Sequence, residues 1–195
     1  AFANSAVIAI PTPSEGAARF RIVESPIMAP ELAARFPAIK TFAGQGIDDP
    51  TATIRCDITP AGFHAQVLSS SGGYYIDPWP SGGADFYASY YARAGSPVEE
   101  SVREWPATGE ADFLPGPLAA NRLVSLDASE SFSSARSGTQ LRTYRLAVAA
   151  TGEYTAFHGG TVLAGQAAIV TAINRVSGIY ERDLSVRLEL VANND

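Results

Sequence analysis

Residues 141–191 read LRTYRLAVAATGEYTAFHGGTVLAGQAAIVTAINRVSGIYERDLSVRLELV. The first ten residues form an apolar run interrupted by Arg142 and Arg145, which is typical of a strand. Thr161 suits a helix N-cap, and a helix is predicted from there to about Asp183. Along it, five apolar side chains recur at intervals near 3.6 and predict one buried stripe: Val162, Ile169, Ile173, Val176 and Tyr180.

Residues 185–191 alternate apolar and polar side chains again, so the pattern is strand, helix, strand. This order predicts a βαβ unit with two parallel strands and a right-handed crossover. A single such unit leaves a sheet edge and a helix face uncovered. We therefore expect residues 141–195 to be the incomplete start of an α/β domain. Residues 1–11 carry no basic n-region, so we expect the chain to begin partway into a longer precursor.

The N-terminal part, residues 1–94, is rich in strand patterns. Residues 52–58 alternate strictly, with Arg55 and Asp57 on the face opposite Ile54, and a turn at 60–62 leads into the next strand. Residues 29–36 read as a short helix because Pro30 suits a first turn and Pro37 stops it. The other predicted strands are 18–22, 63–68, 74–76 and 86–91. The fold class expected overall is α+β, with a mostly antiparallel N-terminal domain.

Residues 95–140 lose apolar periodicity and accumulate proline, glycine, serine and glutamate. This composition predicts a linker between the two domains. An irregular arm packed on a domain is the alternative, because Trp105, Phe113 and Leu114 lie in this stretch. Arg136 and Ser137 lie among small residues shortly before the second domain. They form the candidate activation cleavage site, since exposed small-residue segments are preferred by proteases.

Composition restricts the possible partners. The net charge is −6, and positive residues are not clustered, so nucleic acid is not an expected partner. The chain has no run of 18 apolar residues, so no membrane partner is expected either. Cys56 is the only cysteine, which excludes an internal disulfide and is compatible with a secreted or periplasmic location.

Several stretches resemble bacterial reprolysin-like (M12B-type) zinc metallopeptidases of the metzincin group. In the C-terminal part these are residues 144–154, 168–176, 178–182 and 190–195. Residues 24–28 and 44–50 resemble the propeptide that precedes such a catalytic domain. The resemblance implies a secreted precursor whose N-terminal domain assists folding of the peptidase and keeps it inactive until cleavage. It also implies that the remainder of the catalytic domain is this chain's partner.

The same resemblance implies zinc in the catalytic domain of the parent enzyme, held by an HExxHxxGxxH helix. That motif is absent from these residues. The only histidines are His64 and His158, and neither has a glutamate beside it or a second histidine four residues on. No catalytic residue, zinc ligand or resident cofactor is therefore assigned within this chain, which is expected to be inactive alone.

For each of four further features, a specific functional role is weighed against an ordinary structural role. Cys56 could ligate zinc in a latent enzyme, but its place between Ile54 and Ile58 favours core packing. His64 is predicted to be a solvated strand residue and His158 a turn residue. Asp48 and Asp49 could bind calcium, although a polar turn is the commoner role.

The last of these features is an excess of aromatic residues in the predicted sheet. They could line a carbohydrate or peptide groove, although aromatic residues in strands more often pack in the core or in cross-strand pairs. The alternative function is therefore a secreted binding or adhesion module attached to a protease. The aromatic residues are Tyr74, Tyr75, Trp79, Phe86, Tyr87, Tyr90 and Tyr91.

Overall fold

A computed structural model describes residues 5–79, 86–92 and 140–194. The candidate cleavage site, Arg136 and Ser137, lies outside these residues. The N-terminal part forms a seven-stranded antiparallel sheet whose strand order follows the chain. Its strands are β1 (Ala6–Pro11), β2 (Ala17–Glu24), β3 (Lys40–Gly46), β4 (Thr53–Thr59), β5 (Gly62–Ser69), β6 (Gly72–Pro78) and β7 (Tyr87–Tyr91).

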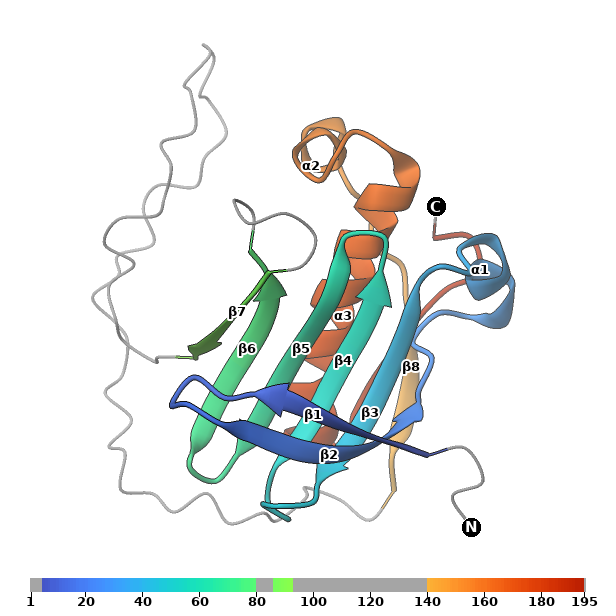
Figure 1. Ribbon diagram of the computed structural model, residues 1–195. Coiled ribbons are helices and arrows are strands. Elements are labelled where there is room, and N and C mark those ends of the chain that lie inside the picture. The colour runs from blue at the N-terminus through green and yellow to red at the C-terminus, as the bar shows by residue number, and fades with distance from the viewer. Residues whose placement is uncertain (1–4, 80–85, 93–139, 195) are drawn as a thin grey trace, which may run out of the picture. The chain divides into compact units, whose positions relative to one another are not determined.

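This sheet bends strongly, so that β1 and β2 cross over one face of the middle strands (Figure 1). Gly44 sits at the bend, where an added Cβ would lie only 2.5 Å from the carbonyl oxygen of Arg21. Ser89 on β7 donates a hydrogen bond of 3.2 Å to the carbonyl oxygen of Pro11 on β1. The first and last strands are thereby brought together, and the sheet resembles half a barrel.

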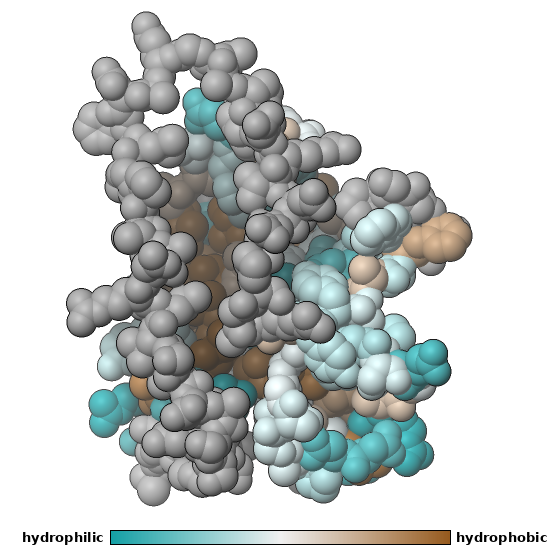
Figure 2. Space-filling model, turned by 90° about the vertical axis from the view of Figure 1, so that its left-hand side faces the viewer, coloured by the Kyte–Doolittle hydropathy of each residue, from teal (hydrophilic) through white to brown (hydrophobic). Residues whose placement is uncertain are grey.

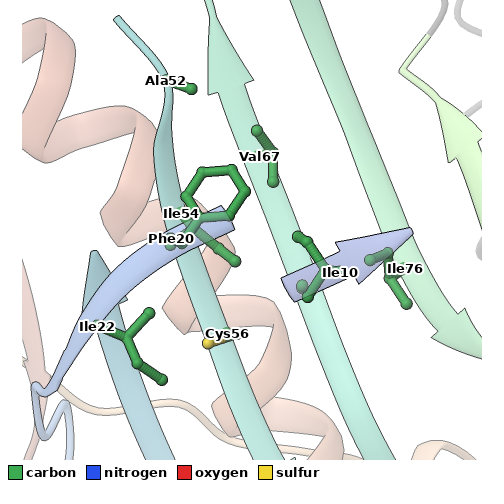
Figure 3. Close-up of a cluster of buried hydrophobic side chains, with 9 residues drawn as sticks. Ile10, Phe20, Ile22, Ala52, Ile54, Cys56, Val67 and Ile76 are labelled. Carbon is green, nitrogen blue, oxygen red and sulfur yellow. The ribbon is translucent and has the colours of Figure 1, made fainter. Parts of the chain in front are cut away.

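The inner face of the bent sheet holds the first hydrophobic core (Figure 3). The side chains drawn there come from β1, β2, β4, β5 and β6, and they converge between the crossing layers. Cys56 is fully buried among them. The core residues are Ile10, Phe20, Ile22, Ala52, Ile54, Cys56, Ala65, Val67 and Ile76.

On one side of the half-barrel, no other described residues cover the apolar side chains. Figure 2 shows apolar side chains gathered on the side that lies to the left in Figure 1, beside polar residues. A cavity of about 320 Å³ is found there between β1 and the strands β5, β6 and β7, lined mainly by Ile8, Ile10, Phe63 and Tyr87.

The C-terminal part forms the predicted βαβ unit. β8 (Arg142–Leu146) pairs in parallel with β9 (Val186–Leu190), and α3 (Val162–Leu184) connects them. Thr161 caps α3 as expected, since its hydroxyl oxygen accepts a hydrogen bond of 3.1 Å from the Ala164 amide. A short helix, α2 (Gly152–Phe157), precedes α3 and was not predicted.

The two parts of the chain pack together in one compact unit. α1 (Pro30–Arg35) and the segment before it cover α3 and β9, forming a second hydrophobic core. Met28 bridges in parallel to Leu190, because the Leu190 amide donates to the Ile27 carbonyl (2.7 Å) and the Ala29 amide donates to the Leu190 carbonyl (2.9 Å). This core contains Ile27, Met28, Leu32, Phe36, Ile39, Ala167, Ile169, Val170 and Leu190.

The predicted apolar stripe of α3 needs correction. Val162 and Tyr180 are exposed, so they do not belong to it. The buried positions of α3 also include the polar residues Gln166, Asn174 and Ser177, of which Asn174 bonds to β4. By length and composition alone α3 is long and apolar enough to cross a membrane, yet here it packs against β4, β5 and β9.

Candidate functional site: a polar seam between the sheet and helix α3

The outer face of β4, β5 and β6 is polar and is covered by α3. In Figure 1, α3 runs directly behind β4 and β5. Alternation along the strands sends apolar side chains to the inner core and polar ones toward the helix. We call this contact the polar seam. Its residues are Arg55, Asp57, His64, Gln66 and Asp77 from the sheet, and Thr171, Asn174, Arg175, Gly178 and Glu181 from α3.

Asp57 is the centre of the polar seam, and its side chain is only 1% exposed. Thr171 donates from its hydroxyl to Asp57 Oδ1 at 2.8 Å, and His64 Nδ1 lies 3.1 Å from the same oxygen. Asn174 donates from Nδ2 to Oδ2 at 3.4 Å and to the Cys56 carbonyl oxygen at 3.0 Å. A buried carboxylate is costly unless its lone pairs are satisfied, and these contacts provide that compensation.

Arg55 anchors one end of the seam with a side chain that is 4% exposed. It forms an ion pair with Glu181 of α3, and its Nη1 donates to Ser25 Oγ at 3.1 Å. Glu181 also accepts a hydrogen bond of 2.5 Å from Arg187 Nε on β9. One carboxylate therefore joins the helix, β9 and the sheet, and the buried charges are paired.

Asp77 on β6 anchors the other end. Its Oδ1 accepts from Arg175 Nη2 of α3 and its Oδ2 accepts from the Tyr90 hydroxyl, both at 2.5 Å. Burial, reinforced by the Asp77 carboxylate, raises the pKa of Tyr90 to about 12. The Arg175 guanidinium lies 5.0 Å from the Tyr75 ring centroid, a cation–π distance.

In the middle of the seam, α3 approaches β4 and β5 closely because residue 178 is a glycine. A Cβ at this position would lie 2.8 Å from Arg55 Cγ and 3.2 Å from Gln66 Oε1. Any larger residue would therefore push α3 away from β4 and β5.

Cys56 faces away from the seam, inside the first core. Burial raises the pKa of its thiol to about 12, so at neutral pH the sulfur is protonated and shielded from solvent. This environment is that of a cysteine packed in a hydrophobic core, the role that was favoured over zinc ligation from the sequence.

The two histidines lie in unlike environments. His64 is not a solvated strand residue as expected: its side chain is 14% exposed, because α3 covers that face. His158 ends α2 as its C-cap, in agreement with the predicted turn role, and its ring lies 4.4 Å from that of Tyr154. Both histidines line one cavity, although no contact between these two distant segments was predicted.

Asp48 and Asp49 form a polar turn. Asp48 accepts from Arg19 Nη2 at 2.6 Å, and this exposed ion pair lowers the pKa of Asp48. Asp49 Oδ1 accepts from the amide and hydroxyl of Thr51, at 2.8 and 2.7 Å. These contacts are those of a polar turn, the commoner of the two roles considered for Asp48 and Asp49.

Tyr75 on β6 and Tyr90 on β7 form a cross-strand pair, with ring centroids 5.7 Å apart. Tyr87 on β7 contacts Phe63 on β5 edge-on, at a centroid distance of 6.5 Å. Trp79, Phe86 and Tyr91 are exposed.

The described residues do not provide a set of ligands that fits zinc. Among residues 5–79, 86–92 and 140–194, no group of three or more His, Cys, Asp or Glu side chains could hold a metal ion.

A comparison with known protein families matches the C-terminal segment of the chain. Residues 140–195 match the model described as Metallo-peptidase family M12B Reprolysin-like. This segment is thus similar to reprolysin-like metallopeptidases. It carries β8, α2, α3 and β9, so Thr171, Asn174, Arg175 and Glu181 belong to the side of the seam that lies in the family match. Searches of curated proteins and of solved structures found no match.

Apart from His64, none of the seam residues was considered as a functional candidate from the sequence. A signal was present, because Asn174 and Arg175 interrupt the most apolar part of the helix. Polar residues there require a polar partner, but the sequence does not say which strand supplies it.

Proposed function

We propose that residues 1–94 are the propeptide of a secreted or periplasmic zinc metalloendopeptidase of bacterial origin. In this proposal the propeptide binds the first helix of the catalytic domain, assists its folding and restrains the enzyme until the linker is cut near Arg136 and Ser137. The partner is the remainder of the same catalytic domain, which also supplies the zinc ligands. Nucleic acid and membrane are not proposed as partners.

The polar seam is the observation that carries this proposal. A sheet from outside the family match contacts the peptidase-like segment through matched polar groups, from Arg55–Glu181 to Asp77–Arg175. Such polar, specific contacts are common where domains dock and must later separate.

The second core supports the folding role. Ile27, Leu32 and Ile39 cover Val170 of α3 and Leu190 of β9, all of them buried. Without this cover, the apolar side of the βαβ unit would face water during synthesis. The cover is partial, because Tyr144 on β8 and Leu184 on α3 remain exposed. The βαβ unit is thus not fully enclosed by the sheet, which is compatible with a catalytic domain that adds further layers.

Expression of the full precursor with changes on the sheet side tests the proposal. Arg55→Met and Asp57→Asn should lower the yield of active peptidase severalfold, because they weaken docking during folding. Once processed, the enzyme should keep a normal kcat/KM, because the altered residues belong to the removed part. Arg19→Met, at an exposed pair with Asp48, is the control and should give a normal yield. Normal yields from all three variants would refute the folding role.

A further inference from the structure

A cavity of about 570 Å³ lies at one end of the polar seam, where both parts of the chain meet. The β4–β5 turn and His64 form one wall, Asp77 contributes from β6, and α2 with the start of α3 forms the other wall. In Figure 1 the β4–β5 turn lies beside this end of α3. Ligand sites are commonly of this size and commonly lie at such junctions. We call it the junction cavity.

Its rim carries nitrogen groups with unused hydrogen-bonding capacity. The Asp57 carboxylate contacts His64 at Nδ1, which leaves the other ring nitrogen, Nε2, available for a further hydrogen bond. The ring nitrogens of His158 and the buried Nε of Arg175 have no hydrogen-bond partner within the described residues. Three nitrogen-bearing side chains therefore line one space.

The Asp77 carboxylate, which lines the junction cavity, already has partners for both of its oxygens. Asp77 uses one oxygen for Arg175 and the other for Tyr90. The floor is apolar, since α3 contributes Ala164, Ala168 and Ala172 on one side of the helix. A rim of imidazole and guanidinium groups over an alanine floor is complementary to a carboxylate attached to an apolar body.

We propose that the junction cavity binds an apolar monocarboxylate, the chemistry found at the C-terminal residue of a peptide. The carboxylate meets His64, His158 and Arg175, and the apolar body lies on the alanines. Because both parts of the chain line the junction cavity, the ligand stabilises their docked arrangement. This inference does not depend on peptidase activity.

Calorimetric titration of the full chain with N-acetyl-L-leucine tests this site, with N-acetyl-L-leucinamide as the matched neutral probe. The acid should bind at least about tenfold more tightly than the amide, because only the acid can pair with the rim. Ala168→Leu should abolish binding by filling the floor. Ala149→Leu, at an exposed position in a different cavity, should leave binding unchanged.

Equal binding of acid and amide, absence of binding at millimolar acid, or full binding by Ala168→Leu would each overturn the proposal. If Ala168→Leu does not fold, His158→Ala decides instead, because it removes one half-buried imidazole from the rim and leaves the floor intact. Its affinity for the acid should fall severalfold while its affinity for the amide stays the same. An unchanged affinity for the acid would overturn the proposal.

Discussion

Asn174 of α3 donates a hydrogen bond of 3.0 Å to the backbone carbonyl oxygen of Cys56 on β4, and both residues are fully buried. This bond links the peptidase-like segment to the main chain of the N-terminal sheet. A second donation from the same amide, to Asp57, means that one side chain satisfies two buried acceptors. The bond fixes the position of α3 along the strand, because a shift by one residue would leave both acceptors unpaired.

Replacing Asn174 by leucine keeps a side chain of similar size but removes both donors. We expect the free energy of unfolding to fall by about 1–3 kcal/mol, because buried acceptors lose their partner. Asn193→Leu, at an exposed position, is the control and should change little. Urea unfolding followed by circular dichroism measures the difference, and equal stability of the two variants would contradict this role of Asn174.

Gly178→Ala tests the close contact in the seam. Alanine is more favourable than glycine in a helix by roughly 1 kcal/mol, so this substitution would stabilise the protein at a position where nothing contacts the added Cβ. Here the added Cβ meets Arg55 and Gln66, and we expect a net loss because overpacking costs about 1–3 kcal/mol. Gly152→Ala at the start of α2 has nothing within 4 Å of its Cβ and should not destabilise. A stabilised Gly178→Ala would show that α3 does not lie against Arg55.

Arg55→Met tests the buried ion pair. The substitution removes the Arg55 guanidinium from Glu181, and breaking a buried pair of this kind costs about 3–5 kcal/mol of stability. Since Arg187 still bonds Glu181, we expect the lower end of that range. Differential scanning calorimetry should show a large decrease in Tm for Arg55→Met. The exposed pair of Arg19 and Asp48 provides the comparison, and Arg19→Met should melt almost normally. Similar melting of both variants would refute the buried pair.

Cys56 should impose a pH dependence at alkaline pH. Its folded pKa of about 12 lies above the ordinary value of 9.0, so the unfolded thiol ionises first. The contribution to stability is complete below pH 9 and decreases as pH rises toward 12. Cys56→Ala should lose this part of the alkaline slope, as measured by urea unfolding at a series of pH values. Rapid reaction of native Cys56 with a thiol reagent at pH 8 would contradict its burial.

Local patterns in the sequence were enough to predict most elements of this fold. Alternation along residues 52–58 predicted β4, and Thr161 marked the start of α3, because both signals act over a few residues. β3 was missed because its glycines, Gly44 and Gly46, carry no side-chain pattern, although Gly44 lies where a Cβ would clash with β2. β1 was missed because residues 6–11 are apolar throughout and show no alternation of apolar and polar side chains.

The site was not predictable in the same way. Alternation placed Arg55 and Asp57 on the face opposite the apolar core, which is correct, but a polar face suggests exposure to solvent. That face is buried only because α3, more than 100 positions further along the chain, covers it with Thr171 and Asn174. Burial of His64 follows from the same contact. A single sequence does not contain the pairing between such distant segments.

Cleavage of the chain between residues 92 and 140, followed by native mass spectrometry, tests most directly whether the sheet recognises the peptidase-like segment. The account predicts that the two fragments remain bound as a one-to-one complex, and that Arg55→Met releases them under the same conditions. Immediate separation of the unaltered fragments, even after only slight dilution of the protein, would contradict the account. The seam and the second core would then not keep the two fragments together without the covalent link.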